Sequence, residues 1–348
     1  MPSTMNALVK PSAAPGAELR RVPVPEIGAR DVLVRVHTAS ICGTDLHIYD
    51  WDPWSQSRIK PPLVFGHEFC GHIEKVGKQV EGLEPGALVS ADMHVFCGHC
   101  YQCRSGEAHI CQSVQILGVD APGCFAEFVR IPAANVVPLG EGIETDYGAI
   151  LDPLGNAVHT VLAGAVAGRS VAVVGCGPIG LMAIAVARAC GAGPIFASEI
   201  NPFRRSLAEK MHADFVLDPG KDDVGAIVQA HTPGGGVDAA LEFSGHPDGI
   251  RTAFHLARPG GRVSLLGIPS RPVEVDLTRD IIFKGLTVQG INGRRLFDTW
   301  HQMIGLLSSK RLDLAPLFTD RLPLADFTMG FERLRQGKSA KVLLSPKG

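Results

Sequence analysis

The stretch Ser170–Gly180, "SVAVVGCGPIG", decides the fold of this chain. An apolar run that ends in Gly-x-Gly-x-x-Gly predicts a β-strand, a tight turn and the start of a helix. Gly175 permits the sharp turn, Gly177 lets the backbone approach a pyrophosphate, and Gly180 lets the helix pack closely on the strand. The free N–H groups at the start of the helix would bind the phosphates. The stretch therefore predicts a dinucleotide site; a merely glycine-rich turn is the alternative.

After this stretch, short apolar segments alternate with segments of helical pattern. The expected strands are 170–175, 194–199, 214–218, 238–245, 262–268 and 286–291. The expected helices are 177–190, 202–211, 224–231, 247–256 and, more weakly, 275–282. Such alternation predicts α/β architecture, with a doubly wound parallel sheet covered by helices on both faces.

The first 150 residues have a different pattern, because short β segments are separated there by Gly and Pro. Examples are 31–39, 71–77, 86–92 and 123–131. Their turn-bounded alternation predicts a compact, mostly β domain. The last fifty residues contain two helical segments, 298–310 and 326–337, followed by a strand at 340–345.

Length and charge narrow the function classes. The chain has 348 residues, and single cores stop growing at roughly 250–300 residues, so we expect two domains. A net charge of −2 gives no electrostatic reason to expect nucleic acid or an anionic membrane as a partner. Residues 170–187 are uncharged and barely long enough to span a bilayer, but Pro178 and three glycines interrupt them, which favours a strand, a turn and a buried helix.

Cysteine usage indicates metal binding in a reducing compartment. The nine cysteines are odd in number, and the first ten residues lack the apolar run of a signal peptide, so we expect a cytoplasmic protein without disulfides. Cys97, Cys100, Cys103 and Cys111 follow the pattern C-x2-C-x2-C-x7-C. Four thiolates complete a tetrahedral zinc shell, which predicts a structural zinc lobe at about 94–115. An iron–sulfur cluster is the competitor, but the last gap is seven rather than three and no proline follows Cys111.

A second metal site is more dispersed. Cys42 lies in "ICGTDLHIYDW" (41–51), and His67 and Glu68 lie in "GHEFCG" (66–71). A zinc ion with two or three protein ligands keeps a position for water or substrate, as catalysis requires. Asp152 in "LDPLGNAVHT" is a further candidate, which could bind zinc, exchange with Glu68, or act from an outer shell in proton movement; we favour the last.

Glu199 indicates which dinucleotide binds. It ends the second expected strand, 19 residues past Gly180, where an acid meets the adenosine ribose hydroxyls. Each negative charge of a 2′-phosphate would repel this carboxylate by about 4 kcal/mol at 4 Å and an effective dielectric constant of 20. We therefore predict NAD rather than NADP, although Arg204 and Arg205 could offset part of the repulsion or be solvated helix positions.

Taken together, Cys42, the Gly-His-Glu at 66–68, the four-cysteine lobe and the glycine turn resemble the zinc-dependent medium-chain alcohol dehydrogenases. The resemblance implies a GroES-like, mostly β catalytic domain made of residues 1–154 and 296–348, and a Rossmann domain at 155–295. The strings at 47–56, 123–133 and 152–160 are similar to members that oxidise the C3 hydroxyl of L-threonine to 2-amino-3-oxobutanoate. A polyol or 2,3-butanediol dehydrogenase is the alternative within the family, and a zinc-lobe nucleic-acid-binding protein is the alternative outside it.

The resemblance also implies a role for each matching position. Cys42, His67 and Glu68 match the catalytic zinc ligands, and the lobe cysteines match the structural ones, which gives two zinc ions per subunit. Thr44 and His47 match a proton relay, and Asp152 matches an acid that tunes catalysis. The positions that match NAD contacts are Gly175, Gly177, Ile179, Gly180, Glu199, Arg204, Leu266, Gly267, Ile268, Ile291 and Asn292. Such enzymes are usually homotetramers.

Overall fold

The computed structural model describes residues 2–346, and the contacts among these residues group them into two units. The first unit contains residues 2–152 and 318–346, and the second contains residues 153–317. The expected return of the chain to the catalytic domain at residue 296 is not tested by this grouping and stays a proposal.

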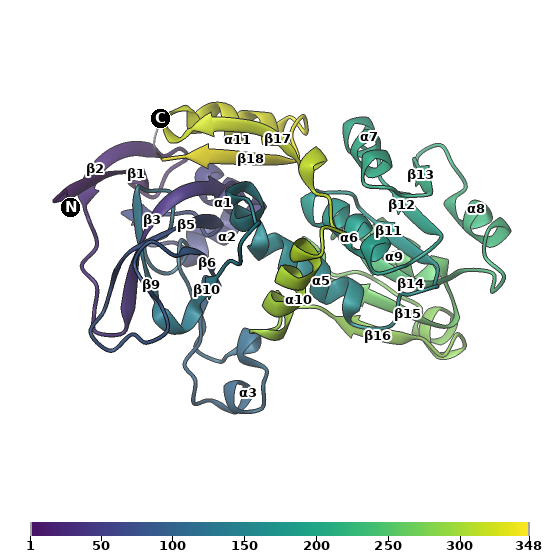
Figure 1. Cartoon of the computed structure of the whole chain (residues 1–348). Helices are drawn as coiled ribbons and strands as arrows, with labels where there is room; N and C mark the ends of the chain where they lie inside the picture. Colours follow the sequence, from purple (N-terminus) through teal and green to yellow (C-terminus); the bar gives the residue numbers. More distant parts are fainter. Residues whose placement is uncertain (1, 347–348) are drawn as a thin grey trace. The chain divides into compact units, whose positions relative to one another are not determined.

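The first unit is built around a sheet of seven strands (Figure 1). Its order is β10 (Val136–Pro138), β6 (Leu88–Ala91), β5 (Phe69–Val76), β3 (Asp31–Ser40), β18 (Lys341–Ser345) and β17 (Phe318–Pro323), with β9 (Phe128–Pro132) also paired to β3. All pairs are antiparallel except β17 with β18. The C-terminal strand β18 is thus built into the N-terminal sheet, where Leu344 faces Ala39.

Smaller elements complete the first unit. A second sheet has the order β2 (Glu18–Pro23), β1 (Thr4–Lys10) and β4 (Leu63–Val64), and β7 (His94–Val95) pairs with β8 (Gln115–Ile116). The helices are α1 (Gly43–Asp50), α2 (Pro53–Arg58), α3 (Tyr101–Arg104), α4 (Thr145–Ala149) and α11 (Phe327–Arg335). Buried apolar side chains, among them Val34 on β3, Phe125 in the segment before β9 and Phe331 on α11, form the larger of two clusters among the described residues of this unit.

The predicted strands at 31–39, 71–77 and 86–92 are confirmed. The strand predicted at 123–131 is only half right, because β9 begins at Phe128. Residues 123–125 instead donate backbone hydrogen bonds to the segment Val64–Gly66. There Gly123 is required, since a Cβ on it would lie 2.1 Å from the carbonyl oxygen of Gly66.

The second unit contains the predicted parallel sheet. Its order is β13 (Phe215–Leu217), β12 (Ile195–Ser198), β11 (Val171–Val174), β14 (Val237–Glu242), β15 (Ala257–Leu265) and β16 (Thr287–Gly290), and every neighbouring pair is parallel. The chain moves outward from β11 in both directions, so the strand order reverses between β11 and β14. Such a reversal opens a ligand-binding crevice at the carboxyl ends of the strands.

Five helices of the second unit lie close to the predicted bounds. They are α6 (Pro178–Ala189), α7 (Pro202–Lys210), α8 (Val224–Ala230), α9 (Pro247–Leu256) and α10 (Asp298–Ser308). The helix α5 (Leu151–Leu162), which starts in the last residues of the first unit's N-terminal segment, was not predicted. The weakly predicted helix at 275–282 is a π-helix at Leu277–Ile282.

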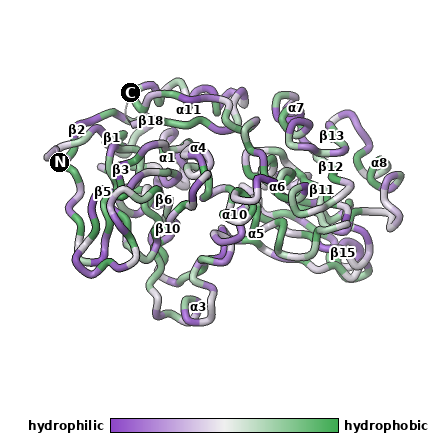
Figure 2. The backbone as a smooth tube through the Cα atoms, in the orientation of Figure 1, coloured by the Kyte–Doolittle hydropathy of each residue, from purple (hydrophilic) through white to green (hydrophobic). Residues whose placement is uncertain are grey.

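The uncharged stretch 170–187 is explained by burial. All four residues of β11 are buried, and so are Gly180–Ala187 of α6, which packs on β11 and β12. Both segments lie at the hydrophobic end of the colour scale in Figure 2. A strand covered on both faces reads as a continuous apolar run. Among residues 2–346, no helix has the length and apolar character that crossing a membrane requires.

Candidate metal centre and dinucleotide site

Cys42 is positioned by the first turn of α1. It stands at the N-cap of this helix, and its backbone N–H donates to Asp45 Oδ2 at 2.9 Å. Its Sγ lies 3.9 Å from Thr44 Oγ1. The helix start therefore brings the thiol and the hydroxyl together, and His47 follows Thr44 on the same helix face, three residues on.

His67 and Glu68 meet Cys42 just before β5. One ligand atom from each of the three residues lies within 4.8 Å of the others. Both His67 and Glu68 are buried. Glu68 Oε1 is a buried acceptor with no hydrogen-bond partner in the described part of the chain. A thiol, an imidazole and an unused carboxylate oxygen form a donor set that fits zinc.

Two buried charges support this cluster. His67 Nδ1 lies 3.3 Å from Asp45 Oδ1, which leaves Nε2 for a metal, as in carboxylate–histidine–metal arrangements. On the other side, Lys341 Nζ donates a short hydrogen bond to Glu68 Oε2 and another to the carbonyl of Ile41 at 3.1 Å. Sequence reasoning assigned no role at this cluster to either Asp45 or Lys341.

The buried charges of the cluster shift the pKa values of His67 and Glu68. Burial alone would lower the pKa of His67, but Asp45 and Cys42 raise this pKa well above its ordinary value. Burial raises the pKa of Glu68, which Lys341 and His67 oppose and Asp152 reinforces. Zinc binding therefore has to displace protons. Asp152 is buried and acts electrostatically on Glu68, yet it is not one of the three clustered ligands.

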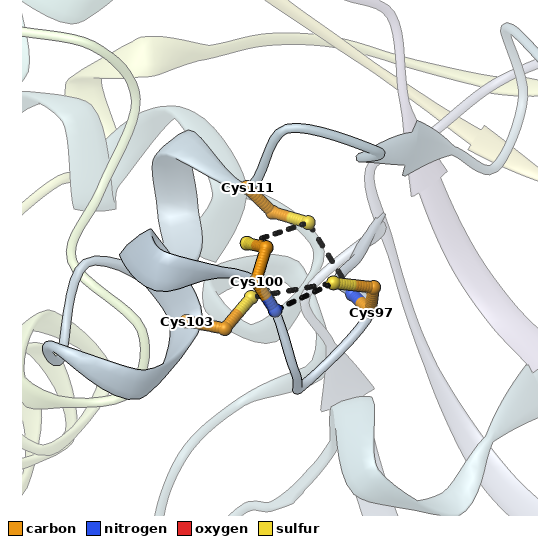
Figure 3. Close-up of side chains that lie close together, drawn as sticks. All are labelled: Cys97, Cys100, Cys103 and Cys111. Atoms are coloured by element: carbon orange, nitrogen blue, oxygen red, sulfur yellow. Dashed lines mark hydrogen bonds between the residues drawn. The ribbon is translucent and has the colours of Figure 1, made fainter.

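The four lobe cysteines converge as predicted (Figure 3). The sulfur atoms of Cys97 and Cys103 are 4.0 Å apart, and those of Cys100 and Cys111 are 3.9 Å apart. A tetrahedral zinc site with Zn–S bonds of about 2.3 Å requires sulfur separations of about 3.8 Å. Backbone hydrogen bonds from Cys103 and Gln112 lower the pKa of Cys100 to about 6, which favours the thiolate. The lobe thus fits a structural zinc ion, and none of the nine cysteines forms a disulfide.

His47 has a partner that sequence reasoning did not identify. Its Nδ1 lies 2.6 Å from Asp52 Oδ2, and its ring packs edge-on against Trp54. Burial tends to raise the pKa of Asp52, but hydrogen bonds from Ser55 and His47 hold this pKa below its usual value. Asp52 also caps α2 by accepting from Ser55 N at 2.9 Å. One carboxylate therefore orients the imidazole and starts the next helix.

The glycine turn has the three properties predicted for it. Gly175 has a φ of +89°, and Gly180 packs so closely that a Cβ on it would lie 2.0 Å from the carbonyl oxygen of Gly175. Gly177 is the N-cap of α6, with Pro178 in the first turn, and a Cβ on Gly177 would meet no atom within 4 Å. This open backbone at a helix N-terminus fits a pyrophosphate.

Glu199 lies at the carboxyl edge of the sheet, beside the glycine turn. It is buried directly after β12, and its two oxygens accept from Cys176 N at 2.7 Å and Asn201 N at 2.8 Å. Arg205 is already engaged, because it donates to the carbonyls of Glu199 and Ile200 and pairs with Asp218 at 3.1 Å. Of the two arginines, Arg205 is thus a structural residue.

The remaining predicted NAD contacts lie at the same edge of the sheet. Ile179 is in the first turn of α6, and Arg204 is in the first turn of α7. Leu266, Gly267 and Ile268 follow β15, and Ile291 and Asn292 follow β16. Ile268 is 91% exposed, which suits a residue that meets a ligand. All eleven predicted NAD contacts therefore lie at the carboxyl edge of the sheet, and their roles remain proposals.

Comparison with known proteins identifies the family. The model of the alcohol dehydrogenase GroES-like domain matches residues 28–141, and that of the zinc-binding dehydrogenases matches residues 178–309. An L-threonine 3-dehydrogenase of Bacillus licheniformis is 50% identical over 346 residues, which cover 99% of this chain and 100% of the relative. The chain belongs to the zinc-dependent medium-chain alcohol dehydrogenases. The predicted combination of a GroES-like domain and a Rossmann domain is thereby confirmed.

Solved structures of the family have the same fold over the full length. A putative zinc-binding dehydrogenase from Sinorhizobium meliloti, bound to NADP, has a TM-score of 0.89 and 30% identity, covering 99% of this chain and 100% of that one. A 2R,3R-butanediol dehydrogenase from Bacillus subtilis has a TM-score of 0.89 and 29% identity with the same coverage. The chain is therefore a zinc-dependent oxidoreductase, and its substrate and its choice of dinucleotide need separate arguments.

The lobe leads to the first prediction. Replacing Cys103 by Ser removes one of four zinc ligands, so we expect bound zinc to fall from about two ions per chain to about one and the thermal midpoint to drop. Metal content is measured by mass spectrometry and the midpoint by circular dichroism. Cys190→Ser, a single-thiol change outside both clusters, is the matched control. Two retained zinc ions with an unchanged midpoint would contradict the structural role of the lobe.

Proposed function

We propose that this chain oxidises the C3 hydroxyl of L-threonine to 2-amino-3-oxobutanoate, with NAD as the hydride acceptor. The main support for the reaction type is that one ligand atom each from Cys42, His67 and Glu68 lie within 4.8 Å of one another. Support for the substrate comes from the relative named L-threonine 3-dehydrogenase, at 50% identity, against 29% for the butanediol dehydrogenase. A polyol or 2,3-butanediol dehydrogenase remains the second candidate.

We assign the metal cluster to substrate activation. Zinc bound at this cluster would supply the Lewis acidity that makes a hydroxyl acidic at neutral pH, and bound NAD would supply the hydride acceptor. Cys42, His67 and Glu68 would hold the ion, and Asp45 fixes the ring orientation of His67. Lys341 balances the charge of Glu68, so the cluster carries less net negative charge than its thiolate and carboxylate alone would give.

The proton leaves along α1 in this proposal. Thr44, next to Cys42, accepts the proton of the substrate hydroxyl through its own hydroxyl oxygen and releases its proton onward. His47 is the group that exchanges a proton with solvent, since its side chain is exposed and an imidazole can both accept and donate a proton. The Asp52 carboxylate stabilises the protonated imidazole from its Nδ1 side. Asp152 does not hold the ion in this proposal, and its charge raises the pKa of Glu68.

We propose NAD over NADP from the position of Glu199. This carboxylate is buried at the end of β12 and its neighbour Arg205 is held by Asp218, so Arg205 does not offer a free guanidinium to a 2′-phosphate. A phosphate there would be repelled by the Glu199 carboxylate by several kcal/mol, and Arg204 in the first turn of α7 would offset only part of this repulsion. The NADP found in the Sinorhizobium meliloti protein is a property of that protein, at 30% identity.

A substrate panel tests the function. We expect L-threonine with NAD to give a kcat/KM at least roughly 10²-fold above sorbitol and 2,3-butanediol, because these lack the ammonium and carboxylate groups and would leave the groups that bind them unpaired. The same assay with NADP in place of NAD is expected to be much slower. NADH formation is followed by absorbance. A preference for sorbitol or 2,3-butanediol would favour the second candidate, and equal use of NADP would contradict the role of Glu199.

His47 leads to a sharper prediction about the relay. His47→Ala should lower kcat roughly 10²-fold near neutral pH and change the pH dependence of kcat. Asp52→Asn should act in the same direction but less strongly, because Asn still caps α2 while the charge beside His47 is lost. His72→Ala, which removes an exposed imidazole on β5, serves as the control. An unaltered pH profile in His47→Ala would remove this residue from the relay.

We also propose a cytoplasmic homotetramer. Free thiols and thiolate-bound zinc suit a reducing compartment. Near the open edge of the parallel sheet, Leu277, Ile282 and Phe283 are 61%, 65% and 81% exposed, and β16 forms that edge. Exposed apolar side chains beside an edge strand are typical of a surface that binds a second copy of the chain.

Light scattering should give a mass about four times that of the 36.9 kDa chain. Phe283→Asp should shift the protein toward smaller species, because it places a charge in the proposed contact. Leu19→Asp, which changes an exposed apolar residue on β2, is the control. A monomer in the wild-type protein would rule out the tetramer, and a tetramer unaffected by Phe283→Asp would rule out this surface.

A further inference from the structure

Glu242 is a fully buried acid whose role no motif indicates. It is the last residue of β14, and its side chain has no exposed surface. Oε1 accepts hydrogen bonds from Ser244 N at 2.8 Å, from Gly245 N at 3.0 Å and, at shorter range, from Ser244 Oγ. Oε2 has no hydrogen-bond partner among residues 2–346. The carboxylate thus holds its own chain in a tight turn immediately after the strand.

The turn that Glu242 holds presses against the glycine turn after β11. A Cβ on Gly175 would lie 2.7 Å from Ser244 N and 2.8 Å from Ser244 Cβ. Beside this contact, Phe243 N donates to the carbonyl of Val174 at 2.8 Å. No side chain fits between the two turns, so a shift of Ser244 displaces Gly175 directly.

The same turn presses against the segment after β15. The backbone carbonyl of Glu242 accepts from Leu266 N at 3.0 Å and from Gly267 N at 3.2 Å. A Cβ on Gly267 would lie 2.2 Å from Gly245 N and 2.5 Å from Glu242 Oε2. A Cβ on Gly245 would lie 2.6 Å from the carbonyl oxygen of Ile268. Glu242 therefore lies where the loops after β11, β14 and β15 meet.

Burying this acid is costly. Burial raises the pKa of Glu242, although hydrogen bonds from Ser244 and Gly245 act in the opposite direction. A carboxylate out of water is unfavourable unless its hydrogen bonds compensate for lost hydration, and an apolar residue would fill the same space at less cost. The acid therefore contributes something that packing does not, which is a fixed conformation of the turn.

We propose that Glu242 is a positioning residue of the dinucleotide site, which sets the affinity for the cofactor without touching it. Through the turn at Ser244–Gly245 it fixes both the pyrophosphate turn at Gly175 and the segment Leu266–Ile268. Small displacements of such backbone reduce binding strongly, since each N–H must keep its direction toward the ligand. The inference rests on the dinucleotide site proposed above.

Glu242→Gln tests it with little change in size. In one orientation the new amide N–H group faces the N–H groups of Ser244 and Gly245, and in the other it is forced against Gly267. We expect the dissociation constants of NADH and ADP-ribose to rise at least tenfold, with the KM for NAD. The KM for L-threonine and the zinc content should stay within twofold of wild type. Binding is measured by fluorescence and calorimetry on the zinc-loaded protein.

Asp238→Asn is the matched control. Asp238 lies on the same strand at its opposite end, where it accepts from Ser170 N at 2.9 Å, Ser170 Oγ at 2.8 Å and Arg258 Nε at 2.9 Å. It also joins separate segments, but away from the carboxyl edge. We expect Asp238→Asn to lower stability and leave both dissociation constants within twofold of wild type. Equal losses of affinity in the two variants would show general destabilisation and overturn the proposal.

The remaining outcomes test the role of Glu242 separately from the dinucleotide site. Unchanged affinities in Glu242→Gln would overturn the role of Glu242 while leaving the dinucleotide site intact. If this variant does not fold, Ser244→Ala removes one donor to Oε1, together with the acceptor of His246 N. It should weaken ADP-ribose binding two- to fivefold, and wild-type affinity in it would overturn the proposal. A wild-type protein that binds neither NADH nor ADP-ribose would instead refute the dinucleotide site itself.

Discussion

The metal centre depends on the compensation of buried charge. Glu68 and His67 are almost fully buried, and each is paired with a buried group of complementary charge: Lys341 for Glu68, and Asp45 for His67. A buried charge without such a partner costs several kcal/mol, more than most single contacts contribute. Lys341 belongs to the C-terminal strand β18, which pairs with β3 at Ala39 and Ser40. The end of the chain therefore completes the site that its first seventy residues begin.

This arrangement explains which residues sequence reasoning found and which it missed. Cys42, His67, Glu68 and the lobe cysteines were found because ligand chemistry restricts residue type and spacing. Lys341 was missed because its partner is 273 residues away and nothing local distinguishes a lysine in a strand. Asp45 and Asp52 were missed for another reason. Both act as helix caps, which is the ordinary role of such residues, and their second contact appears only when the helices are placed.

The second unit was more predictable, because its determinants are local. The strand and helix bounds depend on apolar runs and on residues such as Gly177 and Pro178, and the alternation of strands and helices predicts a parallel sheet covered by helices. Elements of the first unit depend on contacts distant in sequence, so the strand predicted at 123–131 began five residues too early. The hydrogen bonds of 123–125 go to Val64–Gly66, which no periodicity reveals.

The glycine turn is supported on both sides by acids. In the sheet, β11 lies between β12 and β14, and each of these neighbours ends near a buried glutamate. Glu199 holds the turn through Cys176 N, and Glu242 holds Ser244, against which Gly175 packs. Both oxygens of Glu199 and Oε1 of Glu242 accept backbone hydrogen bonds. Glu199 thus supports the turn, and in the function proposed above it also selects the ribose. Changing it to admit NADP removes both, so a change of cofactor preference needs a replacement that still accepts from Cys176 N.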